Sequence, residues 1–228
     1  MNAIKKIFRF LFFRFQKDDV FKLNSTDLIL GLIITWGVGI GRYWDDPGAH
    51  IGQYLGLGSL VYVFVLALIL LLILLPFKIE NLNYKKILTF ITLTSLPAAL
   101  YAIPVERFMT IPEASRLNAQ FLAIVAIWRV AIYWRFLWVI GFNWFRTTIL
   151  AFLPLTLIVT CLTLLNLERA VFRIMGGFRQ ETPANDAYDI LVLLTLTSAI
   201  AVGPLVLSFL GLIAYDWKKS KRLQESRE

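Results

Sequence analysis

The sequence predicts an all-α protein, a polytopic transmembrane bundle of six helical spans with an N-terminal interfacial amphipathic helix. Its 228 residues are 58% hydrophobic, against about 45 to 50% apolar residues in soluble domains. Uncharged apolar stretches near 20 residues long, the length that crosses a bilayer, recur along the chain. Basic residues gather in the segments between alternate stretches. These three observations predict an integral membrane protein.

Six apolar stretches define the predicted membrane domain, residues 25–217. The second is the strongest, because Val61 to Leu75 carries no charge. The third is interrupted by Pro97 and Pro104, so a kinked or re-entrant segment is an alternative there. Gly37 and Gly41 form a G-x-x-x-G pair in the first stretch, and we expect this pair to admit a neighbouring helix. The predicted spans are residues 26–44, 54–76, 87–104, 117–142, 147–167 and 188–217.

Lysine and arginine residues predict the orientation of these spans. The segments on one side of the membrane, which include both termini, carry fifteen of them, and the segments on the other side carry six. Because these residues are enriched in cytoplasmic loops, both termini are predicted to be cytoplasmic. An odd number of spans would place the basic tail outside, which favours six spans over five. The minimal loops and the lack of an organelle address suggest the inner (plasma) membrane of a bacterium.

Residues 1–24 are predicted to form a cytoplasmic amphipathic helix in the membrane interface. Its apolar face would lie in the acyl boundary, with Lys5, Lys6 and Arg9 near anionic lipid headgroups. This arm serves as a topology anchor or, alternatively, senses lipid or binds a partner. Orientation alone accounts for the net charge of +8 and for the basic tail, residues 218–228, so nucleic-acid binding is not expected. The helically spaced apolar residues of the arm are Ile4, Ile7, Phe8, Leu11, Phe12 and Phe15.

Arg129 is the sharpest candidate for a functional residue. It lies 12 residues from Leu117 and 13 from Phe142, near the middle of a predicted span. A guanidinium there costs at least about 2.5 kcal/mol unless it is paired or hydrated. A threonine face on the next span could line a water-filled or anion-accepting cavity with it; alternatively, the threonines bond their own carbonyls and Arg129 forms a closed ion pair. The candidate intramembrane polar site consists of Arg129, Tyr133, Thr156, Thr160, Thr163, Asn166 and Glu168.

Residues for catalysis, metal binding or cofactor binding are not predicted anywhere in the chain. Cys161 is the single cysteine and His50 the single histidine, which excludes a cysteine cluster and a two-histidine site. His50 near Asp45 and Asp46 lacks the spacing of a metal site. Ser59 has no intramembrane histidine that could activate it. The sequence therefore predicts a protein that is not an enzyme.

The middle of the chain resembles a Yip1-type membrane domain of bacteria. Tyr84 to Pro104 (YKKILTFITLTSLPAALYAIP) is an aromatic and basic loop that leads into a span with a central proline. The Trp-rich segment Ile127 to Phe152 follows, with a short Gly-Phe loop between two spans, so the resemblance covers about a third of the chain. It implies a helical membrane protein without known catalytic residues, whose eukaryotic relatives act in vesicle trafficking through protein partners. It implies no site residue.

Two functions follow as hypotheses. The first is a non-enzymatic interaction or scaffold component of the membrane, with other membrane proteins as partners; the missing catalytic constellations, the amphipathic arm and the basic tail favour it. The second is a small channel or transporter for an anionic solute that uses Arg129 and the face of Thr156, Thr160 and Thr163. The two differ in one observable, since a transporter needs Arg129 in a polar cavity that water can reach.

Overall fold

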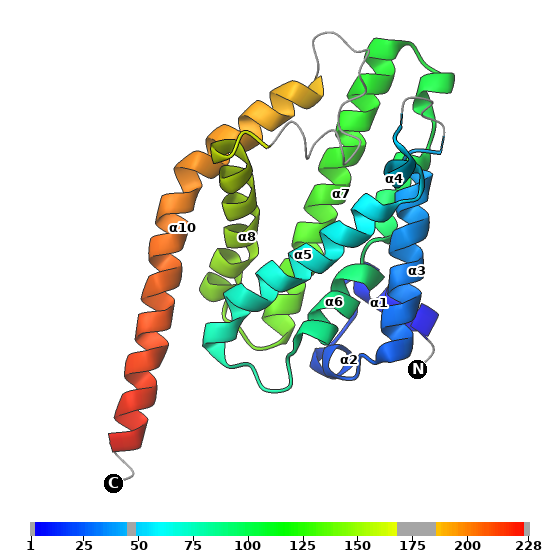
Figure 1. The fold of residues 1–228 in the computed structure, drawn as a ribbon. Coiled ribbons are helices and arrows are strands. Elements are labelled where there is room, and N and C mark those ends of the chain that lie inside the picture. The colour runs from blue at the N-terminus through cyan, green and yellow to red at the C-terminus, as the bar shows by residue number, and fades with distance from the viewer. Residues whose placement is uncertain (1–2, 45–48, 168–185, 226–228) are drawn as a thin grey trace.

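The protein is a helical bundle throughout the part of the chain that the structure describes. A computed structural model describes residues 3–44, 49–167 and 186–225, and Figure 1 shows α10 running along one side of the other helices. The elements, with η for 3-10 helices, are α1 (Ala3–Leu11), α2 (Lys17–Phe21), α3 (Ser25–Gly41), α4 (Ile51–Tyr54), α5 (Leu57–Leu74), η1 (Leu75–Phe77), α6 (Tyr84–Leu93), η2 (Leu96–Ala102), η3 (Val105–Arg107), α7 (Ile111–Val139), α8 (Trp144–Leu164) and α10 (Asp186–Glu225).

Four of the described helices are long and apolar enough to cross a membrane. They are Leu57–Phe77, Pro112–Val139, Trp144–Leu164 and Val192–Arg222, which coincide with the second, fourth, fifth and sixth predicted spans. Helix α3 is apolar but has only 17 residues. At about 1.5 Å per residue it reaches roughly 26 Å, which is less than a bilayer core of about 30 Å. The composition of these helices is that of a membrane protein.

The third predicted span, residues 87–104, is divided into α6 and η2. Pro97 has no amide N–H for the carbonyl of Leu93, four residues earlier, and its ring would clash with that carbonyl in a continuous helix. Helix α6 accordingly ends at Leu93, and a 3-10 helix begins at Leu96 with Pro97 in its first turn. The predicted interruption is therefore present, and it leaves α6 with only 10 residues.

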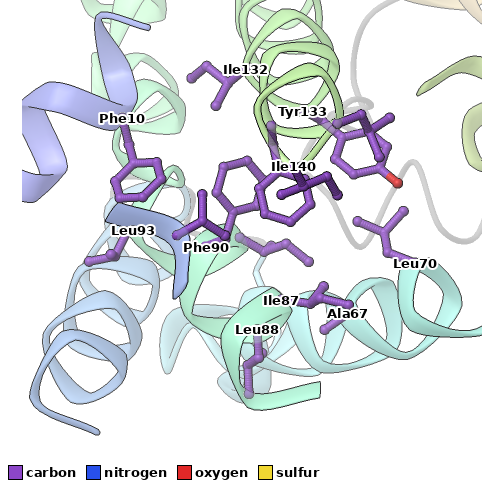
Figure 2. Packing of buried hydrophobic residues seen from close by; sticks show 14 of the residues in the cluster. Phe10, Ala67, Leu70, Ile87, Leu88, Phe90, Leu93, Ile132, Tyr133 and Ile140 are labelled. Atoms are coloured by element: carbon purple, nitrogen blue, oxygen red, sulfur yellow. The ribbon is translucent and has the colours of Figure 1, made fainter. Parts of the chain in front are cut away.

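Helix α6 lies at the centre of the hydrophobic core. Every residue from Ile87 to Leu93 is buried. The Phe90 ring stacks on Phe136 of α7 with a centroid distance of 4.3 Å, and Figure 2 shows side chains from α1, α5 and α7 converging around it. The buried threonines of α6 donate to carbonyls one turn earlier, as Thr92 does to Leu88 at 3.0 Å. A short helix can therefore occupy an apolar core without leaving polar groups unpaired.

The N-terminal arm packs into this core. Phe10 and Phe15 are fully buried, and Phe10 meets Phe90 edge-on at 5.8 Å. The indole N–H of Trp128 in α7 donates to the carbonyl of Leu11 at 3.0 Å. The predicted apolar face is divided between two environments: Ile7, Leu11 and Phe15 are buried in the protein, whereas Ile4, Phe8 and Phe12 are exposed.

A buried ion pair joins the arm to α3. Lys6 and Asp27 form a salt bridge in which both side chains are almost completely buried. Asp27 also accepts a hydrogen bond from the amide of Asn24 at 3.1 Å and so caps the first turn of α3. Arg9 pairs with Asp19 at 2.9 Å. The side chains of Lys6 and Arg9 are thus engaged within the protein, and Lys5 is the exposed cation of the predicted headgroup set.

Helix α3 presents one face of small and polar residues to its neighbours. Asp27, Gly31, Thr35 and Gly39 are its buried residues, spaced four apart. A Cβ at Gly31 would overlap the Thr92 hydroxyl and lie 2.8 Å from Thr92 Cβ, so α3 and α6 meet there almost backbone to backbone. The predicted G-x-x-x-G pair does not make such a contact at both of its glycines. A Cβ at Gly37 would meet open space, and only Gly41 lies close to another segment, at Ala102.

Helix α10 attaches mainly to α8, and an ion pair fixes one end of this contact. Arg146 at the start of α8 makes a two-pronged salt bridge to Asp216, with N–O distances of 2.6 and 2.8 Å. Much of the rest of α10 is exposed, including Leu193, Ile200 and Leu207. Exposed aliphatic side chains on an apolar helix are typical of a surface in contact with lipid.

We predict that Gly31→Ala lowers the thermal stability of the purified protein and that Gly37→Ala does not. The added methyl group collides with Thr92 in the first case and meets nothing in the second. Overpacking of a close contact costs about 1 to 3 kcal/mol. Thermal unfolding followed by size-exclusion chromatography in detergent measures the difference, and equal stability of the two variants would contradict the close approach.

We predict that Lys6→Met releases the N-terminal arm, whereas Lys5→Met leaves it in place. Removing one partner of a buried pair leaves Asp27 as an uncompensated charge, which costs about 3 to 5 kcal/mol. Lys5 is exposed on the same helix and provides the matched control. Limited proteolysis between residues 12 and 24 reports release, and unchanged protection of the Lys6 variant would show that the pair does not hold the arm.

Candidate functional site

A polar cavity lies between α3, α5, η2 and α7, beside the break in the third segment. Its volume is about 50 Å³, which exceeds the minimum of about 10 to 15 Å³ that admits one water molecule. Among the described residues no carboxylate occurs in its lining, whereas two arginines and several hydroxyl groups do. The lining residues are Thr35, Val38, Gly39, Arg42, Tyr43, Gln53, Gly56, Gly58, Ser59, Tyr62, Val63, Ser95, Ala98 and Arg129.

Arg129 reaches this cavity from the middle of α7. Its guanidinium carbon lies 5.8 Å from the centre of the Tyr62 ring of α5, a cation–π contact. Within the described ranges it has no ion pair with a carboxylate. The residue that the sequence singled out therefore lines the cavity, and an aromatic ring of α5 lies beside its guanidinium.

Arg42 is the second guanidinium of the cavity, and the sequence analysis missed it as a site residue. It follows the last turn of α3. Its guanidinium carbon lies 4.4 Å from the centre of the Tyr101 ring of η2. Its Nε is buried and has no hydrogen-bond partner. The positive charge of Arg129 acts on Arg42 as a repulsive like charge. The signal that could have identified Arg42 is its place beside Gly39 and Tyr43, at the end of the buried face of α3.

Hydroxyl groups form the inner wall of the cavity. The Thr35 hydroxyl donates to the Gly31 carbonyl at 2.9 Å and lies 2.9 Å from Ser95 Oγ. Ser95 in turn donates to the Thr92 carbonyl at 2.7 Å. Ser95 is available here because α6 has ended and η2 has not begun. The break in the third segment thus supplies a further polar group to the cavity.

Two glycines bring α3 and α5 together at the side of the cavity. A Cβ at Gly39 would lie 2.9 Å from the Gly56 carbonyl oxygen and from Ser59. Gly56 adopts the left-handed conformation, with φ of 66°, directly before α5 begins. Residues with a side chain rarely take this conformation, and here the Cβ would also meet the backbone of α3. This contact holds Ser59 and Tyr62 beside Arg129.

The predicted threonine face does not join Arg129, because the cavity lining contains no residue of α8. Thr156 donates to the Leu153 carbonyl at 3.0 Å and Thr163 to the Val159 carbonyl at 3.0 Å. Thr160 Oγ1 is buried without a hydrogen-bond partner. The alternative in which these hydroxyls bond their own backbone therefore describes Thr156 and Thr163.

The remaining predicted site residues lie apart from the cavity. Tyr133 is buried in the core cluster, and its hydroxyl has no hydrogen-bond partner. Asn166 ends α8 in a left-handed conformation with φ of 53°, and its side chain is exposed. Glu168 lies outside the described residues. Of the members of the predicted set that the structure describes, Arg129 alone lines the cavity.

Metal-ligating side chains do not cluster in the described ranges, where no group of three or more His, Cys, Asp and Glu residues is found. His50 is exposed at the start of α4. Asp45 and Asp46, which the sequence places near it, lie outside the described residues. Ser59 contributes its hydroxyl to the cavity beside Tyr62 and Gln53.

The fold and the cavity define an all-helical protein that has four helices capable of crossing a membrane and a polar pocket with two arginines. No protein-family model, curated protein or solved structure matches the chain. The resemblance to Yip1-type domains therefore stays a prediction.

We predict that the cavity attracts anionic reagents. In a Cys161→Ser background, Ser59→Cys should react faster with an anionic methanethiosulfonate than with a cationic one. Arg42→Gln or Arg129→Gln should each lower this rate ratio about tenfold, which corresponds to about 1.4 kcal/mol of charge interaction.

Two matched controls accompany this measurement. Arg135→Gln removes a charge from the same helix as Arg129 but outside the cavity lining, and it should leave the ratio unchanged. Thr160→Cys, on α8, should show no preference for the anionic reagent. A ratio near one at Ser59→Cys in the protein with both arginines intact would show that the site is not electropositive.

Proposed function

We propose that the chain is an integral membrane protein that takes an anionic solute into the arginine cavity, as a small channel or transporter. One observation carries this proposal: Arg42 and Arg129 line one cavity, and no carboxylate of the described residues lines it with them. Unpaired cations at the depth of an apolar helix are costly and default to a functional role. A bound anion would neutralise both charges.

A broken helix beside the cavity supports the transporter class. Ser95 and Ala98 of the cavity lie at the interruption between α6 and η2. Secondary transporters build their substrate sites at interrupted helices near the middle of the bilayer, because the interruption exposes polar groups there. Pro154 and Pro204 lie within α8 and α10 and offer further points where a helix can bend.

Six membrane-crossing segments are part of this proposal. Lys85 at the start of α6 donates to the Ser25 hydroxyl at 2.7 Å, and the Trp44 indole donates to the Ala102 carbonyl at 2.9 Å. These contacts join the beginning and the end of the third segment to the beginning and the end of the first. If α3 crosses the membrane, the broken segment from α6 to η2 crosses beside it.

The orientation in this proposal rests on the charge distribution. Six segments place the arm and the basic tail on one side, and the excess of lysine and arginine there favours the cytoplasm of a bacterial cell. The cavity lies toward the far end of α3, so we propose that it faces the outer side of the inner membrane. The exposed face of α1, with Ile4, Phe8, Phe12 and Lys5, would lie against lipid and its anionic headgroups.

Anion flux into proteoliposomes tests the proposed function. Purified protein should raise the uptake of at least one of chloride, sulfate and inorganic phosphate above that of protein-free vesicles. Arg42→Gln and Arg129→Gln should each reduce this uptake at least tenfold, since each removes one charge from the cavity. Arg135→Gln, outside the lining, should retain it.

Labelling of the same protein in sealed cells measures which side of the membrane the cavity and the tail face. A membrane-impermeant thiol reagent should reach Ser59→Cys from outside and reach Lys221→Cys only after permeabilisation. Uptake no higher than in protein-free vesicles for all three ions would reject the transporter, and reaction of both cysteines from one side would reject the orientation.

A non-enzymatic scaffold is the second candidate function. The last turns of α10 extend away from the bundle in Figure 1, and Lys218, Lys219, Lys221 and Arg222 are exposed there. An exposed basic helix end can bind an acidic partner segment or anionic lipid. In the same vesicles, binding of an acidic partner that is lost on tail truncation, without any anion flux, would favour this function.

A further inference from the structure

We infer that the cavity binds one doubly charged tetrahedral oxyanion, a phosphate or sulfate group, in preference to a singly charged ion. This inference rests on the proposed anion binding and names the chemical class of the ligand. The ligand can be a free ion or the terminal phosphate of a larger molecule, because both present the same group to the two arginines.

The charge of the cavity sets the charge of the ligand. An arginine side chain carries a positive charge in proteins, and no acidic residue in the described part of the chain lines the cavity. A singly charged ion such as chloride would leave one positive charge uncompensated between apolar helices. A dianion neutralises both, and the interaction is strong because few water molecules fit around it.

The donors of the two arginines suit the oxygen atoms of a phosphate. Each guanidinium lies over a tyrosine ring, Arg42 over Tyr101 and Arg129 over Tyr62. The N–H donors of a guanidinium lie in its plane and match the oxygen spacing of a phosphate. The buried Nε of Arg42 is such a donor without a partner.

The remaining lining groups suit an oxyanion. Ser59 and Gln53 carry hydrogen-bond donors on the side of α5 and α4, and Tyr62 adds a phenol. Uncharged donors of this kind complete the coordination of a phosphate oxygen. An aliphatic ligand would leave these groups and both arginines without partners, which costs free energy for each buried group.

The size of the cavity limits the ligand to one compact group. Its volume of about 50 Å³ exceeds the minimum of about 10 to 15 Å³ that admits one water molecule, and it is small enough to favour a single compact ion such as phosphate or sulfate. A dicarboxylate has the same charge but needs room for a carbon chain between its two ends. We therefore expect succinate to bind poorly.

Protection of Ser59→Cys from a neutral thiol reagent tests this inference, with the protein in detergent or nanodiscs at constant ionic strength. Sodium sulfate should slow the reaction at concentrations at least tenfold lower than sodium chloride or sodium succinate. Inorganic phosphate should protect better at pH 8 than at pH 5.5, because the free ion is mainly singly charged at the lower pH and mainly doubly charged at the higher. Sulfate protection should not change over this range.

Two arms distinguish the source of the phosphate group. Nanodiscs that contain phosphatidic acid present a lipid phosphate, whereas phosphatidylcholine nanodiscs with added inorganic phosphate present the free ion. Protection in the first arm alone assigns a lipid headgroup, and protection in the second arm alone assigns a free ion. Protection in neither arm and none by sulfate overturns the inference.

Conservative variants keep the test independent of folding. Arg42→Lys and Arg129→Lys retain each charge but lose the planar pair of donors, and each should weaken sulfate protection at least tenfold while chloride protection changes little. Equal protection by chloride and sulfate overturns the dianion and leaves the proposed anion binding intact. Absence of protection by every anion, together with absence of flux, rejects both proposals.

Discussion

The close approach of α3 to α6 is the constraint on which the rest of the structure depends. Gly31 faces Thr92 with no room for a Cβ, and this contact places α6 directly beside α3. A hydroxyl of α6 can sit against bare backbone because it is already bonded to the Leu88 carbonyl. In an apolar medium, where helices gain nothing by merely excluding water, close packing of small residues is the main source of their association. The arm, α5 and α7 then pack around this pair.

The third segment, which runs from α6 to η2, lies in two different environments. Where α6 is a regular helix, Phe90 is surrounded by Phe10, Phe15 and Phe136, and the core is dense. Beyond Leu93 the chain turns into η2, and backbone and hydroxyl groups replace the large aromatic rings. The cavity begins at this change. The phenylalanines of the core do not line the cavity, so the two halves of the bundle differ in both packing and polarity.

Sequence patterns identified the features that depend on local composition, and missed those that depend on which segments meet. The apolar stretches predicted the four long helices, and Pro97 predicted the interruption of the third segment, because both act within one segment. Arg129 was found because a charge within an apolar stretch is visible without a structure. Arg42 stands where a span was expected to end, so it looked like a boundary residue. Lys6 belonged to an expected lipid-facing set, and its pairing with Asp27 joins positions 21 residues apart, which no local pattern reveals.

The free energy of an unpaired arginine in an apolar medium distinguishes a closed packing role from a ligand site for Arg42 and Arg129. An arginine that only supports packing is usually paired, because an unpaired guanidinium at this depth costs at least about 2.5 kcal/mol. The chain does pair Lys6 with Asp27 and Arg146 with Asp216, so it has acidic residues to use. In the cavity lining, the described arginines lie over tyrosine rings instead, Arg42 over Tyr101 and Arg129 over Tyr62. In the proposed function a bound anion offsets the cost of these charges, and a ligand at a hundred times its dissociation constant stabilises its binding state by about 2.7 kcal/mol. That gain is comparable to the cost of one such arginine, so binding of the proposed anion would measurably stabilise the folded protein.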